Sequence, residues 1–427
     1  MTRSEHLRRK AEQDRRREAQ EKRLANQRRR EEREKCRLER EAEGRELAKG
    51  PIDLTFLLLV CLLLGIGLIM VLSASYPSAY YTHKSHNPFF YFKRQVIWAI
   101  LGLCAMTVTA KIDYHRFKAL SKPVLFVAII LLALVLVPGV GTTRNNATRW
   151  IEVGGLSLQP SEIAKFAVAL YFADSISKKR DKMRTFRYGI LPYGIILGII
   201  ALLMMKEPHL SGTVLILGTG AVMMTVGGIP LWLVGAGLGS VGAVGGLYVH
   251  KVLSDIAQYG KSELYGASRI AMWKDPFIDR QRDGYQMVQS LLSIGSGGLL
   301  GVGLGKSRQK FLYLPEEHND FIFSIVCEEL GLIGAAIIML LFAALILRGY
   351  WIALHARDRF GALLVVGMTT FVALQVFLNI GVVTGLLPNT GISLPFFSYG
   401  GTALCIQLVE MGVILSVSRQ MKPPREG

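Results

Sequence analysis

The chain has 427 residues, of which 51% are hydrophobic and only 19% are charged. A soluble globular protein rarely carries this balance, so composition indicates that most of the chain lies in a membrane. The net charge of +18 comes from an N-terminal tail and from short loops between apolar runs. That placement fits anionic lipid and membrane topology, and it argues against a nucleic-acid partner. The five cysteines include no Cys-x-x-Cys pair, so we expect no disulfide framework, metal knuckle or redox site.

Residues 1–50 form a separate basic segment, rich in Arg, Glu, Lys and Gln and almost free of large apolar side chains. Such a segment cannot bury a core, so we expect a charged helix or disorder. Its mixed charge does not resemble a cleavable signal peptide. Its excess of Arg and Lys predicts a cytoplasmic tail near lipid headgroups that acts mainly as a topology anchor.

Ten apolar stretches follow, each a candidate to cross the hydrocarbon core as a helix. We therefore expect an all-α, polytopic membrane domain over residues 51–421, with about ten transmembrane helices and a short cytoplasmic tail at 422–427. The predicted spans are Ile52–Ser73, Gln95–Ala110, Val124–Val140, Ser161–Ile176, Gly189–Met205, Gly212–Thr225, Pro230–His250, Phe321–Leu347, Gly361–Leu386 and Thr402–Val417.

Loop charges predict the orientation of these spans. The basic segments 111–118, 178–184, 348–359 and 419–425 would share one side with the N-terminal tail, and the positive-inside rule makes that side cytoplasmic, with both termini inside. The opposite side receives the segment Lys251–Asp320. Because this segment is too long for a plain connection, we expect an extracellular loop that carries short helices at the membrane surface.

The segment Gly301-Val-Gly-Leu-Gly-Lys-Ser307 resembles a phosphate-binding P-loop. That motif requires a glycine at position 300, where this chain has Leu300, and it must follow a strand. The spacing therefore excludes this segment as a nucleotide site.

Glu162 and Lys165 are the first ionisable pair that could carry chemistry. They lie three residues apart just after Pro160, which suits the first position of a helix, so both side chains share one face. Lys165 lies a turn inside an apolar span, where charge is costly and usually functional, although a simple ion pair with Glu162 is the alternative. Arg149-Trp150 precedes this helix and suits either phosphate binding or interfacial anchoring.

Further polar candidates lie in the long loop and near other span ends. Asp275 and Asp279 flank Pro276-Phe277, and either carboxylate could serve as a base or hold a cation. His209 suits an interfacial residue or a proton carrier. Glu316, Glu317, His318 and Asp320 resemble a metal cluster in composition, but their spacing matches no zinc signature, so we expect no protein metal site.

Three carboxylates, Glu328, Glu329 and Glu410, lie inside predicted spans and should face the bundle interior or a water-filled cavity. The segment Leu387–Gly401 has the Pro and Gly content of a re-entrant or broken helix packed against protein.

Together these motifs resemble the SEDS family, the FtsW, RodA and SpoVE proteins, from about Pro51 to Met421, and favour its FtsW/SpoVE branch. The residues that carry the resemblance are Arg149-Trp150, Gln159–Lys165, Asp275–Asp279, Gly284–Ser290, Gln309–Phe323, Glu328–Gly331 and Leu394–Gly401.

The resemblance implies a peptidoglycan glycosyltransferase that polymerises lipid II on the outer face of a bacterial cytoplasmic membrane, for septal or spore wall synthesis. It also implies a class B penicillin-binding protein as transpeptidase partner, other divisome proteins as further partners, and Mg²⁺ or Mn²⁺ as the candidate cofactor. Asp279 matches the family's essential acidic residue, Lys165 its partner, and Glu162 and Arg149 their neighbours. We expect further substrate contacts from the same motifs, at Trp150, Gln286, Gln289, Ser290, Glu316, His318, Asp320, Ser398 and Tyr399.

One position departs from the resemblance. The family usually has Asp where this chain has His209, after Glu207-Pro208. Two other functions stay open from the residues alone. The intramembrane carboxylates would also suit a lipid II flippase, and the basic tail would suit a non-catalytic divisome scaffold.

Overall fold

The computed structural model describes residues 50–82, 86–144, 147–153, 156–207, 209–259 and 267–421. The part of the chain that begins at Pro51 forms one compact unit. The predicted basic tail at 1–50, apart from Gly50, and the tail at 422–427 lie outside the described residues.

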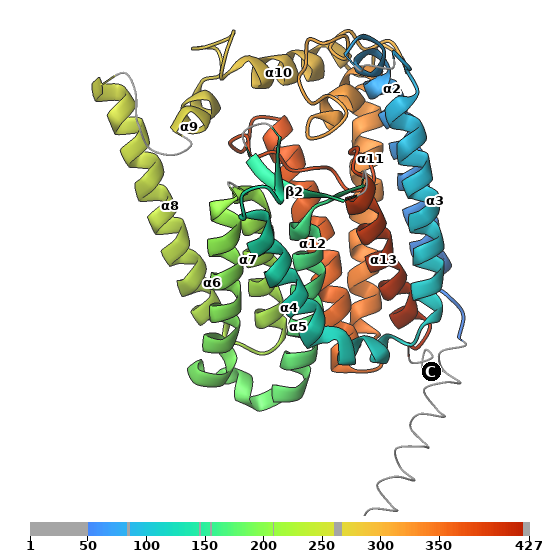
Figure 1. Ribbon diagram of the computed structural model, residues 1–427, viewed down its shortest axis with the longest axis vertical. Helices are drawn as coiled ribbons and strands as arrows, with labels where there is room; N and C mark the ends of the chain where they lie inside the picture. The colour runs from blue at the N-terminus through green and yellow to red at the C-terminus, as the bar shows by residue number, and fades with distance from the viewer. Residues whose placement is uncertain are drawn as a thin grey trace, which may run out of the picture. The chain divides into compact units, whose positions relative to one another are not determined.

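Each of the ten predicted spans overlaps a helix, and the predicted all-α membrane fold is confirmed (Figure 1). Six helices of the described part are long and apolar enough by themselves to cross a membrane, and α7 is a shorter apolar helix. The ten helices are α2 (Leu54–Tyr81), α3 (Phe90–Lys111), α4 (Phe117–Val135), α5 (Pro160–Lys179), α6 (Leu191–Lys206), α7 (Leu210–Val226), α8 (Leu231–Tyr259), α11 (Ile322–Leu354), α12 (Arg359–Val383) and α13 (Gly401–Ser418).

The long segment between α8 and α11 carries two short helices, α9 (Ala267–Lys274) and α10 (Tyr285–Gly297), which confirms that it is not a plain connection. The helix at the seventh predicted span, α8, is longer than predicted and continues past His250 to Tyr259. A 3-10 turn at Arg180–Arg184 and a π turn at Phe186–Ile190 connect α5 to α6.

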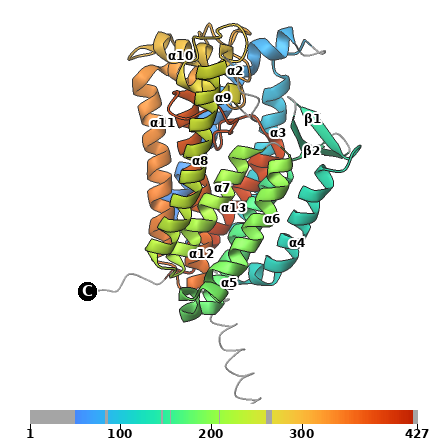
Figure 2. The same cartoon turned by 90° about the vertical axis from the view of Figure 1, so that its left-hand side faces the viewer.

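A small antiparallel sheet connects α4 to α5. This sheet was not predicted from the sequence. Its strands β1 (Gly141–Arg144), β2 (Ala147–Val153) and β3 (Leu156–Leu158) pair in the order β1-β2-β3. Gly141 pairs with Ile151, and Ile151 pairs with Leu158. The sheet contacts the end of α4 and the beginning of α5, and it lies beside the bundle (Figure 2).

Helix packing depends on close backbone approach at small residues. A Cβ on Gly412 of α13 would lie 2.5 Å from the carbonyl oxygen of Met106 in α3, and a Cβ on Gly67 of α2 would lie 2.3 Å from the carbonyl oxygen of Phe396. Small residues at such contacts are typical of membrane bundles, where dispersion replaces the hydrophobic effect between helices. The sequence therefore brings α13 against α3, and the segment before α13 against α2.

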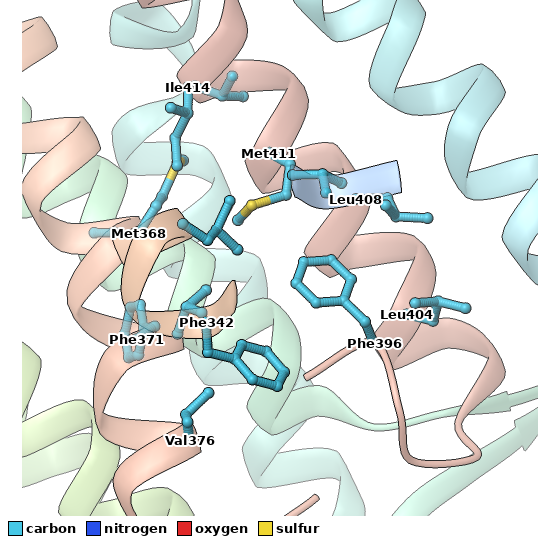
Figure 3. Packing of buried hydrophobic residues seen from close by; sticks show 14 of the residues in the cluster. Phe342, Met368, Phe371, Val376, Phe396, Leu404, Leu408, Met411 and Ile414 are labelled. Atoms are coloured by element: carbon cyan, nitrogen blue, oxygen red, sulfur yellow. The ribbon is translucent and has the colours of Figure 1, made fainter. Parts of the chain in front are cut away.

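The core centres on α12, which packs against α5, α7 and α11. Residues on all sides of α12 are buried, so it is an interior helix. Phe342 of α11 stacks on Phe396 at a centroid distance of 6.5 Å, and Met368 and Met411 fill the space nearby (Figure 3).

The two ends of the bundle differ in chemistry. At one end, which we call the basic end, Lys118 contacts Asp358 at 3.3 Å and Gln420 donates to Asp113 at 3.0 Å. Of the basic segments that the sequence predicts on one side, 111–118 contacts both 348–359 and 419–421 there. The other end, which we call the loop end, carries the sheet, α9, α10 and residues 298–320 and 387–400 (Figure 1).

Candidate active site

A cavity of ≈ 1130 Å³ opens within the loop end. Polar side chains line it from β2, from the first turns of α5 and α7, from α12 and α13, and from residues 316–320 and 389–400. Because these elements come from all parts of the membrane domain, the cavity forms only when the bundle is assembled.

The Glu162–Lys165 pair lies on the cavity wall. Lys165 Nζ contacts Glu162 Oε2 at 2.7 Å, and Lys165 is only 6% exposed. The same ammonium lies 3.5 Å from Gln375 Oε1 of α12, and Gln375 Nε2 donates to the carbonyl of Ser393 at 2.9 Å. The lysine is therefore held in a fixed position between α5, α12 and the segment before α13.

Arg149 and Trp150 of β2 also line the cavity. Arg149 Nε donates to the carbonyl of Glu207 at 3.5 Å. Burial raises the pKa of the Glu207 carboxyl to about 8, against the opposing charge of Arg149. This carboxyl is therefore mostly neutral at pH 7.

His209 caps α7 beside these groups and lines the cavity. Burial, with the nearby charges of Arg149 and Lys165, lowers the pKa of its imidazole to about 3. The ring is consequently neutral at pH 7, in contrast to the Asp that the family resemblance led us to expect at this position.

Residues 316–320 form another part of the wall. Glu316, His318 and Asp320 all line the cavity. Burial and the neighbouring Glu316 raise the pKa of Asp320 to about 6, while Arg149 and His318 oppose the shift. Among the residues that the structure describes, no three His, Cys, Asp or Glu side chains are grouped so as to hold a metal ion.

An aromatic cluster lies beside this segment. The His318 ring lies 4.6 Å from Tyr91, and Tyr91 lies 5.0 Å from Tyr399 between ring centroids. Ser398 lines the cavity too, but its hydroxyl donates to the carbonyl of Asn319 at 2.7 Å and accepts from Leu394 N at 2.6 Å. Ser398 therefore fastens the segment before α13 to the segment before α11.

The α10 residues divide between the cavity and the core. Gln286 lines the cavity, donates to the carbonyl of Pro315 at 3.2 Å and accepts from Asn389 at 2.9 Å. Gln289 does not line the cavity. Ser290 is fully buried, and its hydroxyl lies 2.8 Å from both Ser324 Oγ and the carbonyl of Val383.

Asp279 lies in the turn between α9 and α10 and does not line the cavity. Its Oδ1 accepts from Arg282 N at 3.1 Å. Asp283, four residues further on, lines the cavity instead. The structure thus brings Glu162, Lys165, Arg149 and Asp320 to one cavity and leaves Asp279 outside its wall.

Several cavity residues were missed as site residues. Gln375 lies inside the predicted ninth span, where a lone amide was the available signal. Ser161 and Asp283 also line the cavity, and neither was predicted as a site residue. Glu410 also lines the cavity, which confirms the expectation that this intramembrane carboxylate faces the bundle interior or a cavity.

Comparison with known proteins gives consistent matches over the membrane domain. The sequence profile of the FtsW/RodA/SpoVE cell cycle proteins matches residues 54–423. The probable peptidoglycan glycosyltransferase FtsW of Geobacter metallireducens is 42% identical over 372 residues, covering 87% of this chain and 95% of the relative. Stage V sporulation protein E of Bacillus subtilis is 43% identical over 368 residues, covering 86% and 97%.

Solved structures agree with these relatives. The rod shape determining protein RodA of Thermus thermophilus superposes with a TM-score of 0.63 at 26% identity, covering 87% of this chain and 98% of RodA. A chain of a peptidoglycan synthase complex that coordinates polymerisation and crosslinking superposes with a TM-score of 0.67 at 25% identity, covering 86% and 98%.

Proposed function

The chain belongs to the FtsW/RodA/SpoVE family of cell cycle proteins, and on this basis we propose that it is a peptidoglycan glycosyltransferase that polymerises lipid II. The observation that carries the proposal is the loop-end cavity, in which Arg149 and the Glu162–Lys165 pair lie on one wall. Septal or spore wall synthesis is the role that its FtsW and SpoVE relatives suggest.

The proposal places the loop end on the outer face of the cytoplasmic membrane of a bacterium. Its support is the charge of the basic end, where residues 111–118, 348–359 and 419–421 carry Lys and Arg, because such loops stay cytoplasmic. Both termini are then cytoplasmic. A class B penicillin-binding protein is the proposed transpeptidase partner, in keeping with the likeness to a synthase complex that couples polymerisation to crosslinking.

The proposed reaction is an inverting displacement. The C4 hydroxyl of the acceptor's terminal GlcNAc attacks the anomeric carbon of the donor MurNAc, the bond from that carbon to the phosphate oxygen breaks, and undecaprenyl pyrophosphate leaves. Asp279 is the proposed general base that takes the hydroxyl proton. Because Asp279 lies outside the cavity wall while Asp283 lines it, the turn that carries both residues must bring Asp279 over the cavity during the reaction.

Negative charge develops on the leaving pyrophosphate, and Arg149 and Lys165 would stabilise it electrostatically. Mg²⁺ or Mn²⁺ typically binds through substrate phosphates with one or two carboxylates. The carboxylates of Glu316 and Asp320 line the same cavity and fit that role.

The test uses the full chain with its transpeptidase partner and labelled lipid II. We expect wild type to lengthen glycan and Asp279→Asn to lose ~10²–10⁴ in rate, the usual contribution of a general base. Asp275→Asn is the matched control in the same turn and should keep wild-type activity. If Asp279→Asn makes glycan chains like those of wild type, Asp279 is not the general base. If wild type makes no glycan, the proposed activity is wrong.

A flippase remains the alternative function, but the structure offers it less support than the sequence did. Glu328 and Glu329 do not line the cavity, because they are buried against Ser293, Ser307 and Lys310. Of the three intramembrane carboxylates, Glu410 alone lines the cavity. Reconstituted vesicles separate the two functions, since a flippase moves labelled lipid II across the bilayer without lengthening glycan.

A further inference from the structure

Two helices begin at the same part of the cavity wall. The first turn of α5 contributes Ser161 and Glu162, and the start of α7 contributes His209 and Ser211. Each helix N-terminus carries a partial positive charge and N–H groups without partners inside the helix, and both features favour anions. The cavity therefore receives two positive helix ends.

Each helix start also presents a buried polar group that lacks a partner. Ser161 is 2% exposed and His209 is 7% exposed. Neither Ser161 Oγ nor His209 Nδ1 has a hydrogen-bond partner among the described residues. A buried polar atom left in this way costs free energy, and both residues line the cavity, where a bound ligand can supply the missing partner.

Two cationic side chains lie beside these atoms. Arg149 and Lys165 both lie close enough to His209 to lower its pKa. The acidic neighbour Glu207 has a pKa raised to about 8 and is mostly neutral at pH 7. Glu162 is occupied by its ion pair with Lys165 at 2.7 Å.

Five further carboxyl groups line other parts of the cavity, and two further cations, Arg94 and Arg269, line it as well. The five are those of Glu152, Asp283, Glu316, Asp320 and Glu410. The proposed anion site is therefore limited to the part of the wall at the two helix ends.

We propose that the N-termini of α5 and α7, with Arg149 and Lys165, form a binding site for the diphosphate of the lipid-linked substrate, in which Ser161 Oγ and His209 Nδ1 donate hydrogen bonds to phosphate oxygens. This site rests on the proposed function and names where its leaving group binds. In the neutral imidazole, the tautomer with its proton on Nδ1 makes this donation.

The experiment measures binding to the full chain in lipid nanodiscs by calorimetry. The probes are inorganic pyrophosphate and undecaprenyl pyrophosphate, which share the diphosphate and differ in the lipid. We expect His209→Ala and Ser161→Ala each to weaken both probes by about tenfold, the size of one hydrogen bond to a charged group. His209→Asn keeps a donor near the Nδ1 position and should bind within about threefold of wild type. Thr225→Val, at the far end of α7, is the control and should bind like wild type.

Thermal unfolding of each variant shows whether it is folded. Equal affinity of wild type, His209→Ala and Ser161→Ala for both probes overturns the site, as does weakened binding in Thr225→Val alone. If wild type polymerises lipid II and the two alanine variants bind both probes unchanged, the site fails and the proposed function stands. If the variants lose binding as expected while wild type makes no glycan, the site stands and the proposed function fails.

Discussion

Replacement of Lys310 by Met tests whether a buried ion pair supports the loop end. Lys310 is 3% exposed, and its Nζ lies 2.9 Å from Glu329 Oε1 and 3.0 Å from Ser73 Oγ. At that distance the attraction between the charges is ~6 kcal/mol for an effective dielectric constant of about 20. Desolvation of both charges offsets most of this gain. The pair as a whole therefore contributes little to the free energy of unfolding, but each buried charge depends on the other for compensation.

Lys310→Met alone leaves the Glu329 carboxylate buried and uncompensated, so we expect it to lower the free energy of unfolding by about 3–5 kcal/mol. The double variant Lys310→Met, Glu329→Leu removes both charges and should recover most of that loss. Lys306→Met is the matched control, because Lys306 is exposed in the same segment. The assay is equilibrium unfolding in a denaturing detergent series.

Two results would refute this reasoning. One is a Lys310→Met variant as stable as Lys306→Met, which would mean that the carboxylate finds another partner or a proton at no cost. The other is a double variant less stable than the single one, which would mean that the pair stabilises the fold outright.

Three further predictions concern other parts of the fold. Because the folded-state pKa of Asp320 is raised to about 6, its contribution to stability is fully present below about pH 4 and is lost as pH rises through about 6. Between about pH 4 and pH 6 the free energy of unfolding should therefore fall by about 1–3 kcal/mol less in Asp320→Asn than in wild type. Equilibrium unfolding of both proteins across this pH range checks the prediction. Asp358→Ala removes the acceptor of the Tyr114 hydroxyl at 2.6 Å and the N-cap of α12. We expect it to lower the free energy of unfolding by about 2–3 kcal/mol, while glycan synthesis per folded molecule stays unchanged. Gly331→Ala forces a side chain onto a φ of 69° with its Cβ 2.3 Å from Gly301 N, so the midpoint of thermal unfolding should fall, and an unchanged midpoint would contradict this.

The membrane helices could be predicted because their signal is local. A run of apolar residues long enough to span the bilayer must become a helix there, since lipid offers no hydrogen-bond partner to the backbone. The predicted start of the eighth span at Phe321 is one residue from the start of α11 at Ile322. The end of α8 at Tyr259 was missed, because a helix leaving the membrane continues through polar residues that hydropathy does not register.

The sheet between α4 and α5 had only a weak signal. Its strands have 4, 7 and 3 residues, too short for a clear alternation of apolar and polar side chains. The dipeptides Asn145-Asn146 and Gly154-Gly155 separate them in the sequence and are typical of hairpin turns. The strands also hold Arg149 in the cavity wall, so the missed sheet positions a residue that its motif had identified.

The candidate site was predictable only where its residues are neighbours in sequence. The spacing of Glu162 and Lys165 put both on one helix face, and the structure has them in contact at 2.7 Å. Gln375 reaches the same ammonium across 210 positions of sequence. Contacts of that kind depend on which helices pack together, and hydrophobic periodicity does not determine this.

The glycine-rich segment Gly301–Ser307 connects two features that the sequence treated separately. Gly301, Gly303 and Gly305 all have positive φ, between 80° and 102°, a conformation that glycine adopts without strain. The segment thereby folds onto the N-terminal part of α11, where Val302 N and Gly303 N donate to the carbonyls of Glu328 and Glu329 at 2.9 and 3.0 Å. The glycines that make this segment resemble a phosphate-binding loop therefore allow its backbone to approach the backbone of α11 closely.

The side chains of the same glutamates complete that contact. Ser307 N donates to Glu329 Oε1 at 3.3 Å, and Arg308 N donates to Glu328 Oε1 at 2.9 Å. The backbone N–H groups of this segment therefore bind an anion, as those of a P-loop do, but the anion is a carboxylate of the chain itself. Because those carboxylates are already bound, they do not offer an open polar path across the membrane. The contact of Glu329 with Lys310 also holds the start of the segment that leads to the cavity wall at Glu316–Asp320.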